Sequence, residues 1–397
     1  MGISKVTGGN GHRTATKPPA EQSVTLVSNA MTRVDDLIAD LRAGRIRYAP
    51  EIQQSLRPHY APEIQQSVRP QELTEVNFPS QKYILHAGKE PLDATKLPTE
   101  IVARGKDATY KHSVTEKSKK TKKENARDLK HRVKKIHQQV RALYAQFTES
   151  VLVLLEGDNA DGKDGMLRHV FKLNPATTSG SKAFKSASPE QRLHEPNWRF
   201  MNHLPGPGQI GFHNRSAYGD VVFACDTDAE RVGREADIKE MEYGLIMGLP
   251  MTPEGHIALP DATGQVAPSA IQRPPMRIVK VFLNICKAEQ AERLADRLLD
   301  KTKLYKASQA DIDGHEAHEA VQTSFANAMA STSTAWCPTY IIPNDNKRTG
   351  WRKLAQIISK ILDDMDCQHP PYDGDLDLAG RKEVARPLLA EVERARR

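Results

Sequence analysis

The sequence has few cysteines and lacks any long apolar run. Its four cysteines are widely spaced and contain no C-x-x-C pair; they are Cys225, Cys286, Cys337 and Cys367. This spacing argues against a disulfide framework and is typical of reduced thiols in a cytoplasmic protein. No apolar stretch approaches the length that crosses a bilayer, and no signal-peptide core is present. The sequence therefore predicts a cytoplasmic protein with no membrane partner.

Apolar residues are scarce for a chain of this length, whereas positive charge is in excess. Hydrophobic residues make up 38% of the 397 residues, and the mean hydropathy is -0.59. Such a composition predicts that substantial segments lie outside a packed core. The formal net charge is +7 and the isoelectric point is near 9.0, which favours a polyanionic partner.

The motif with the clearest chemistry lies within Val151–Pro175. The apolar run Val151–Leu155 predicts a buried strand, the turn Gly157–Lys163 fits G-x-x-x-x-G-K, and a helix is expected to follow. Backbone N–H groups of such a turn surround a phosphate while the lysine reaches the terminal phosphates. An ordinary glycine-rich turn is the alternative, and the flanking strand and helix favour the phosphate site. Asp164 stands where Ser or Thr normally holds magnesium, so phosphates and carboxylates would have to hold the metal.

The amino-terminal part lacks sustained periodicity as far as about Pro98 and contains a duplication. The twelve-residue segment 48–59 is repeated almost unchanged at 60–71. Two copies are too few for a solenoid, and prolines near both ends favour an extended spacer over a docking segment. We therefore expect residues 1–125 to form a low-complexity, disordered extension. Residues 126–366 are expected to form one domain with a lid at about 293–320, and residues 367–397 a charged tail.

Further elements follow from periodicity. A lysine-rich stretch at 117–135 merges into an amphipathic helix whose apolar stripe runs from Leu129 to Phe147. Its lysines are expected to form a solvated helix face, with polyanion binding as the alternative. Residues 233–275 are expected to form an insertion or long loop. Two more strands are expected at 210–213 and 277–285, a final short strand and turn at 338–346, and three more helices at 287–299, 311–330 and 351–365. This alternation predicts a three-layer α/β/α fold with a mostly parallel sheet.

Polar side chains are expected beyond the carboxyl ends of the strands, where parallel sheets bind ligands. Those that follow the second strand are Asn214, Arg215 and Asp220. Arg293 and Arg297 lie at i, i+4 on one predicted helix and fit a phosphate clamp. Surface ion pairs with Asp296 or Asp300 are equally compatible with the sequence.

The segment 314–318 contains two histidines around a glutamate but does not fit a zinc motif. H-E-x-x-H needs histidines four residues apart, whereas His315 and His318 are three apart. Metal binding is therefore not expected at this segment.

In combination, these motifs resemble the P-loop type of polyphosphate kinase, the polyphosphate kinase 2 family. The family patterns are G-x-D-x-x-G-K-D-G, I-R-H-V, N-P, S-F-K, H-D-x-x-W-R and L-P-x-x-G-x-I-G-x-x-N-R-S-x-Y-x-D-V. They correspond in order to Gly157–Gly165, Leu167–Val170, Asn174–Pro175, Ala183–Lys185, His194–Arg199 and Leu204–Val221. Further similarity is found at Ile278–Arg297, Tyr305–Ile312, Thr332–Thr334 and Ile342–Lys347. The resemblance covers about Ala126–Met365.

The resemblance implies a P-loop kinase-like fold and reversible, Mg²⁺-dependent phosphoryl transfer between inorganic polyphosphate and a nucleotide. ADP and ATP are the first expectation, with AMP or GDP as other acceptors; nucleic acid is not expected, and a homo-oligomer (dimer or tetramer) is implied. The implied catalytic residues are Lys163, Arg215, Asn159 and Asp161. The implied nucleotide- or polyphosphate-binding residues are Gly157, Gly162, Asp164, Gly165, Lys185, Asn214, Arg293, Arg297 and Lys306. The implied magnesium ligands are Asp158, Asp161 and Asp164.

The sequence departs from the family pattern at several positions that bear on catalysis. Asn159 replaces the family's aspartate in the turn, and an amide supplies neither the charge that magnesium prefers nor a base. Gly219, Cys225 and the segment 318–321 replace an acidic residue, an arginine and the aromatic W-D-D-Y. These departures leave two alternatives to a polyphosphate kinase: an impaired family member that binds polyphosphate or nucleotide without turnover, and a P-loop kinase for another small acceptor.

Overall fold

A computed structural model describes residues 20–50, 52, 84–85, 119–172, 174–371 and 380–396. Its centre is a six-stranded sheet in the order β1-β6-β5-β2-β4-β3. The strands are β1 (Ile84–Leu85), β2 (Ser150–Glu156), β3 (Thr178–Ala183), β4 (Ile210–Asn214), β5 (Met276–Asn284) and β6 (Thr339–Pro343). β1 pairs antiparallel with β6, and every other neighbouring pair is parallel. The predicted mostly parallel sheet is confirmed.

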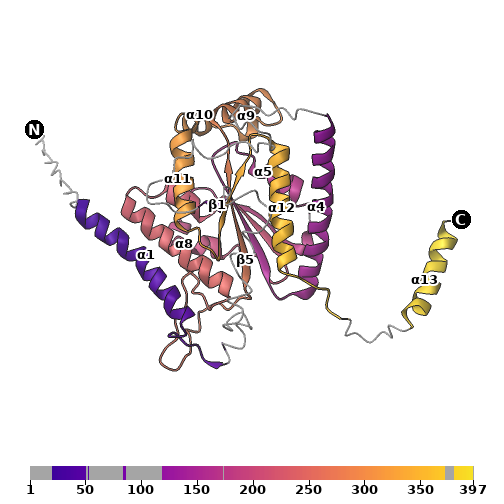
Figure 1. Cartoon of the computed structure of the whole chain (residues 1–397), viewed down its shortest axis with the longest axis horizontal. Helices are drawn as coiled ribbons and strands as arrows, with labels where there is room; N and C mark the ends of the chain where they lie inside the picture. The colour runs from indigo at the N-terminus through magenta and orange to yellow at the C-terminus, as the bar shows by residue number, and fades with distance from the viewer. Residues whose placement is uncertain are drawn as a thin grey trace, which may run out of the picture.

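Helices cover both faces of the sheet (Figure 1). Side chains alternate along β2: Val151, Val153 and Leu155 pack on one side, with α4 (Lys119–Gln146), α5 (Lys163–Val170) and α12 (Lys347–Asp364). Leu152 and Leu154 pack on the other side, with α7 (Ala217–Phe223), α8 (Asp228–Met247) and α11 (His318–Ser331). Because both faces are covered, all seven residues of β2 are buried. The three-layer α/β/α architecture is therefore confirmed.

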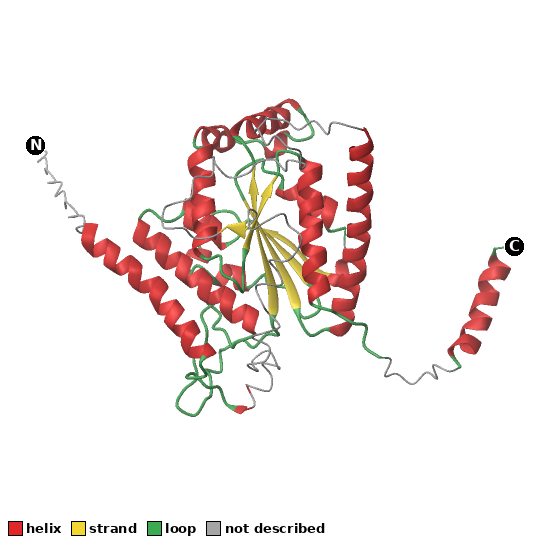
Figure 2. Cartoon of the chain, viewed as in Figure 1, coloured by secondary structure: helices red, strands yellow, loops and turns green. Residues whose placement is uncertain are grey.

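A further set of helices lies at the carboxyl ends of the parallel strands (Figure 2). These are α9 (Lys287–Leu299), the short 3₁₀ helix η6 (Leu304–Lys306) and α10 (Gln309–Glu316). The remaining short elements are η4 (Pro175–Thr177), η5 (Gln191–Leu193) and α6 (Trp198–Met201). None of the helices within the described ranges has the length and apolar character needed to span a membrane.

The amino-terminal segment differs from the prediction of a disordered extension. Residues Ala20–Arg42 form a helix, α1, that packs against α8. Val34, Ile38 and Leu41 are buried, and Lys239 donates to Asp35 at 2.6 Å. Their spacing of four and three residues is helical but brief, so the surrounding polar residues masked it. Of the duplicated segment, only residues 48–50 and Ile52 are described; the rest of the duplication lies outside the described residues.

The predicted loop at 233–275 is wrong in its first part, where α8 continues to Met247. Thr227 and Glu230 form a capping box that starts this helix, and Gly248 ends it in a left-handed conformation. Gly244 allows close packing, because a Cβ there would lie 2.2 Å from the Met251 sulfur. Gly244 therefore reflects close packing of a helix, although its presence contributed to the prediction of a loop.

Three other elements were not predicted as they stand. β3 is mostly exposed and polar, so no apolar pattern marked it. The helix expected at 311–330 is divided at Ala317 into α10 and α11. In the predicted tail, Arg381–Ala395 form the exposed helix α13.

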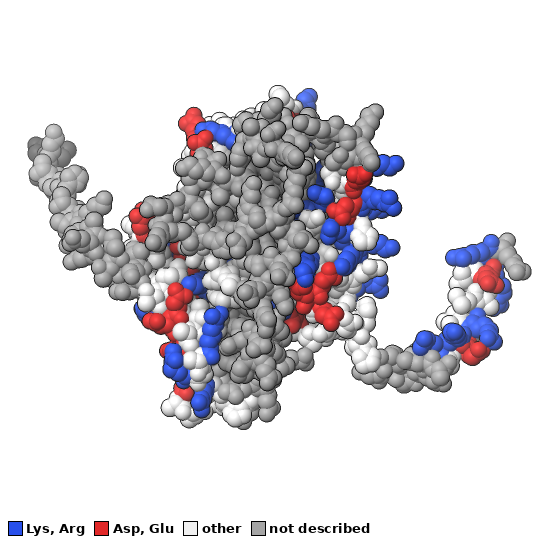
Figure 3. Space-filling view, in the orientation of Figure 1, with Lys and Arg blue, Asp and Glu red and all other residues white. Residues whose placement is uncertain are grey.

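α4 confirms the predicted amphipathic helix and begins earlier, at Lys119. Ile136, Val140 and Leu143 are fully buried on its inner face. Lysine and arginine side chains gather along the edge of the molecule that α4 forms (Figure 3). The helix therefore presents an apolar side to the domain and a basic side to solvent.

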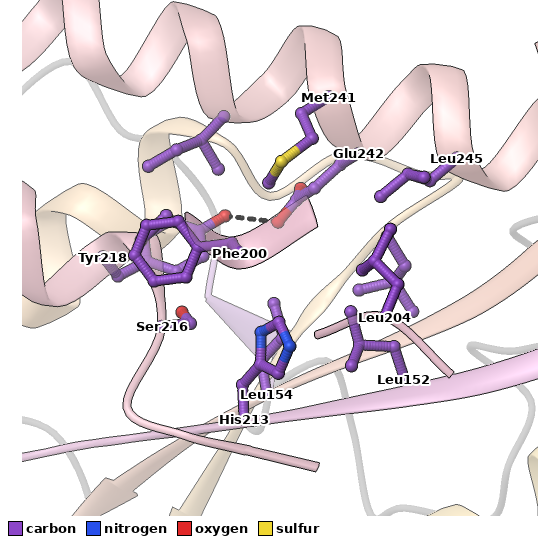
Figure 4. A pocket seen from close by; sticks show the side chains of 13 residues that line it. Leu152, Leu154, Phe200, Leu204, His213, Ser216, Tyr218, Met241, Glu242 and Leu245 are labelled. Carbon is purple, nitrogen blue, oxygen red and sulfur yellow. Dashed lines mark hydrogen bonds between the residues drawn. The ribbon is translucent and has the colours of Figure 1, made fainter. Parts of the chain in front are cut away.

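A small cavity of about 10 Å³ lies between the sheet and α8 (Figure 4). Most of its lining is apolar, including Leu152, Phe200 and Met241. His213 also lines it, and its Nε2 faces the His203 carbonyl oxygen at 3.2 Å. Burial lowers the pKa of His213 to about 4.

We expect His213 to make the fold sensitive to mild acid. Its pKa is about 4 in the fold against an ordinary value of 6.5, so the unfolded chain takes up this proton first as the pH falls. The contribution is complete above pH 6.5 and is lost between pH 6.5 and 4, where stability falls by about 3 kcal/mol. Urea denaturation at several pH values should show that the free energy of unfolding falls less between pH 6.5 and 4 for His213→Gln than for the parent protein. An equal fall with pH in the two proteins would contradict the prediction.

Candidate functional site

The turn after β2 depends on two glycines with positive φ. Gly157 has φ 141° and Gly162 has φ 105°. A Cβ on Gly157 would lie 2.2 Å from an Asp161 carboxylate oxygen, and one on Gly162 would lie 2.8 Å from the Asn344 amide nitrogen. Side chains at either position would therefore clash and strain the backbone. The turn leads directly into α5, whose first residue is Lys163.

Lys163 is buried at the start of α5 and closes the turn. Its Nζ donates to the carbonyl oxygens of Gly157 at 2.8 Å and Asp158 at 2.9 Å, and to the Asp161 carboxylate at 2.8 Å. Burial raises the pKa of the Asp161 carboxyl, although the charge of Lys163 opposes that shift. A helix N-terminus with a cation inside a curled backbone is the arrangement that binds phosphate groups.

Asp158 is also buried and is held by two helices that lie beyond the strand ends. Its carboxylate accepts from Gln290 of α9 at 2.8 Å, and His318 Nδ1 of α11 lies 3.0 Å away. Burial alone would raise the pKa of Asp158, but the hydrogen bonds from His318, the Asn159 amide and Gln290 outweigh it and lower the pKa. These contacts fix the turn to α9 and α11.

Asn159 and Arg215 form a second polar contact at the turn. The Arg215 guanidinium donates to the Asn159 side-chain oxygen at 2.5 Å. Arg215 follows β4 with φ 67°, and its amide donates to the Leu155 carbonyl oxygen at 3.0 Å. The register between β2 and β4 pairs Leu155 with Asn214 and so brings Arg215 to the turn.

Asp164 lies on the exposed side of α5, between residues of β4 and η6. Its carboxylate accepts from Asn214 at 2.9 Å and from the Lys306 ammonium at 2.6 Å. The Lys306 hydrogen bond lowers the pKa of Asp164, against partial burial. The Asp164 side chain is 60% exposed, so this carboxylate is accessible from solvent.

The two arginines of α9 have different environments. The side chain of Arg293 is buried, and its five N–H donors contact Glu289 and the carbonyl oxygens of four residues: Ala160, Asp161, Asn344 and Asp345. Arg293 therefore ties the turn to the end of β6 and has no free donor for a phosphate. Arg297 is more exposed and pairs with Asp311 at 3.0 Å, which is neither of the partners expected from the sequence.

Glu156, the last residue of β2, is a buried carboxyl beneath the turn. One of its oxygens accepts the Ser216 amide N–H, and the other has no hydrogen-bond partner among the described residues. Burial raises the pKa of Glu156 to about 7, although Ser216 and Lys163 oppose the shift. Glu156 therefore keeps its proton to a higher pH than an ordinary carboxyl, beside the cations of the site.

The structure brings most of the predicted site residues together. Lys163, Asn159, Arg215, Asp164 and Lys306 gather at the carboxyl ends of β2 and β4 through the contacts above. Lys185 follows β3 at the same edge, but its side chain is exposed, and its carbonyl oxygen accepts from Arg199. Asp220 pairs instead with Arg199 of α6 and Arg234 of α8.

Several residues of the site were missed by the sequence analysis: Glu156, Gln290, Asn344 and His318 as a partner of Asp158. Nothing in the local sequence marks Gln290 or Asn344, because their roles depend on contacts across the fold. His318 was noted in the rejected zinc motif and as a departure from an aromatic pattern, but not as a partner of Asp158. The partner of His318 is the Asp158 carboxylate. The described residues contain no group of three or more His, Cys, Asp or Glu side chains that could hold a metal ion.

Comparison with known proteins gives a match to one family over most of the chain. Residues 116–246 and 268–370, more than half of the chain, match the family model of polyphosphate kinase 2 (PPK2). An ADP-polyphosphate phosphotransferase of Rhodopseudomonas palustris is 27% identical over 253 residues, which cover 61% of this chain and 80% of the relative. An AMP/ADP-polyphosphate phosphotransferase of Meiothermus ruber is 31% identical over 236 residues, which cover 57% and 77%.

A solved structure shows the same fold. The crystal structure of polyphosphate kinase 2 from Arthrobacter aurescens TC1 superposes with a TM-score of 0.59 at 23% identity. The superposition covers 77% of this chain and 96% of that chain. The three-layer domain of this chain therefore has the same fold as that kinase.

Proposed function

Because the chain belongs to the polyphosphate kinase 2 family, we propose that it transfers phosphoryl groups reversibly between inorganic polyphosphate and a nucleoside diphosphate or monophosphate, with ADP and ATP as the main pair. It is a phosphotransferase by family. The observation that carries the proposal is the position of Lys163 at the start of α5, within a glycine turn that Arg215 reaches from β4. AMP and GDP are further candidate acceptors.

The site is suited to a reaction in which positioning and charge neutralisation supply most of the catalysis. Lys163 would bind the transferring phosphates by exchanging its bonds to the carbonyl oxygens of the turn for phosphate oxygens. Arg215 would neutralise charge on the same phosphates while Asn159 holds its guanidinium in place. Lys306 and Arg297 would bind the phosphate chain from the side of η6 and α9. Arg293 would act by positioning the turn rather than by touching substrate.

The carboxylate and amide oxygens at the turn fit a magnesium ion for which substrate phosphates supply most of the ligands. Mg²⁺ in kinase sites takes one or two carboxylates with phosphates and water. Asp164 is the accessible carboxylate, with Asn214 beside it. The side chains of Asp158 and Asp161 are buried, with 5% and 2% of their surface exposed, so Asp164 is proposed as the main protein ligand. When bound, the ion would neutralise charge between the phosphates.

The direct test mixes the full-length protein with ADP, long-chain polyphosphate and Mg²⁺ and follows ATP by luminescence. ATP formation is expected, and AMP and GDP in place of ADP would define the acceptor range. No ATP, together with retention of polyphosphate in a filter-binding assay, would instead identify a binding protein without turnover. Phosphoryl transfer from ATP to another small acceptor, without use of polyphosphate, would identify a P-loop kinase for that acceptor.

Asn159→Asp tests whether the amide at this position limits the rate. The substitution adds a negative charge at the turn, beside Arg215, where an ion pair replaces the present hydrogen bond. We expect kcat to rise about tenfold, because a second carboxylate would share magnesium with Asp164. Asn202→Asp, a change of the same kind on an exposed residue after α6, is the control. A fall in kcat would show that the Asn159–Arg215 contact itself is required.

Two further predictions from the sequence remain proposals. We propose a cytoplasmic location and a homo-oligomer, either a dimer or a tetramer. Light scattering after size-exclusion chromatography would measure the oligomeric state, and a mass of 44.2 kDa would identify a monomer.

A further inference from the structure

Five basic side chains form a straight ladder on the outer face of α4. They are Lys123, Arg127, Lys130, Lys134 and Arg141, and all five are exposed. At 100° per residue they fall within an arc of about 60°, and at 1.5 Å per residue they extend over about 27 Å. The buried Ile136, Val140 and Leu143 lie on the opposite face. The ladder is therefore set by the orientation in which α4 packs on the domain.

The ladder residues make no ion pair with any residue in the described part of the chain, in contrast to other basic residues of α4. Arg132 pairs with Asp128 at 3.1 Å, and Lys135 pairs with Asp363 at 2.6 Å. Glu124 is the acidic residue that is exposed on the described part of this helix. Like charges at i, i+4 destabilise a helix, so an anion along the ladder would relieve their repulsion.

We propose that the ladder is a second binding surface for polyphosphate, outside the phosphate turn. This inference rests on the proposed function. A flexible linear polyanion matches a straight row of cations, and binding would release counterions from both. α4 begins at the same end of the molecule as α9 and α10, which lie beyond the strand ends (Figure 1). A long chain with one end at Lys163 can therefore continue along α4.

The chemistry of the ladder favours polyphosphate over single-stranded nucleic acid. Proteins that bind single strands combine cations with aromatic side chains on which bases stack. No Phe, Tyr or Trp occurs between Lys123 and Arg141. The ladder thus offers cations for phosphates and no aromatic side chain on which a base could stack. It holds the distal part of the chain and raises the local concentration of the end that reacts.

The test compares long-chain polyphosphate with tripolyphosphate, which is too short to fill the turn and lie along the ladder at once. In the double variant Lys130→Gln/Lys134→Gln, KM for long-chain polyphosphate should rise about tenfold. KM for tripolyphosphate and for ADP should stay unchanged. The control Lys382→Gln/Arg394→Gln removes two exposed charges from α13 and should change neither KM. Thermal unfolding of all variants confirms that the fold is intact.

Three outcomes would overturn the inference. They are an unchanged KM for the long chain, an equal rise for tripolyphosphate, or a loss of affinity for a single-stranded oligonucleotide with no loss for polyphosphate. Failure of the proposed function is separable, because it would appear as absence of ATP in the parent protein. Filter binding of long-chain polyphosphate then replaces KM, and about tenfold weaker binding by the ladder variant alone would still support the ladder.

Discussion

Lys163→Met is expected to lower kcat/KM for ATP formation from ADP and polyphosphate by about 10²- to 10³-fold, the usual effect of removing one donor that stabilises transition-state charge. Methionine keeps the apolar length of the side chain and removes its charge. The turn keeps its glycine geometry, since Gly157 and Gly162 are unchanged, and the Lys163 backbone amide still donates to Asp161 at 3.2 Å. The loss should therefore fall mainly on kcat.

The matched control is Lys172→Met, which removes an exposed lysine just beyond the other end of α5. It should leave kcat/KM within about twofold of the parent value, as surface substitutions generally do. A parent and a Lys163→Met protein of equal activity would show that the turn does not bind the transferring phosphates. If activity is lost, thermal unfolding distinguishes the loss of phosphate binding from misfolding, which has to be tested because Asp161 loses a buried partner in the variant.

Arg293→Ala is expected to destabilise the domain by about 3–5 kcal/mol, the range for removing one partner of a buried charged contact. The side chain connects α9, the turn and β6 through Glu289 and four carbonyl oxygens. Its loss removes a hydrogen-bond donor from each of these oxygens, although the Asp161 carbonyl oxygen keeps the Asn344 side-chain amide as a donor. Urea denaturation measures the change, and the midpoint should shift without a change of slope.

Arg297→Ala provides the comparison, since it removes the next arginine on the same face of α9. Its ion pair with Asp311 is partly exposed, so the expected cost is about 1 kcal/mol or less. Arg293→Lys restores the charge but not the planar fork, and should recover less than half of the lost stability. Equal stability of the two alanine variants would show that Arg293 does not hold the turn.

The sequence by itself determined the layers of the domain and the position of the turn. The uniform apolar run of β2 and the 3.6-residue stripes of α4 and α12 report burial directly, so all three elements were predicted, although both helices begin earlier than their apolar stripes. The G-x-x-x-x-G-K spacing likewise specifies a backbone path, because only glycine fits at Gly157 and Gly162. These properties are local, and a local pattern is sufficient to encode them.

The tertiary structure alone decided which polar residues meet at the turn. The sequence placed Arg293 with Arg297 as a phosphate clamp, whereas packing of α9 directs Arg293 to the backbone of the turn. The tertiary structure also pairs Asp158 with His318 of α11, a residue 160 positions away. In the same way, α1 is stabilised by its contact with α8 rather than by its own sequence. Such pairings depend on the register of strands and the packing of helices, which no local spacing records.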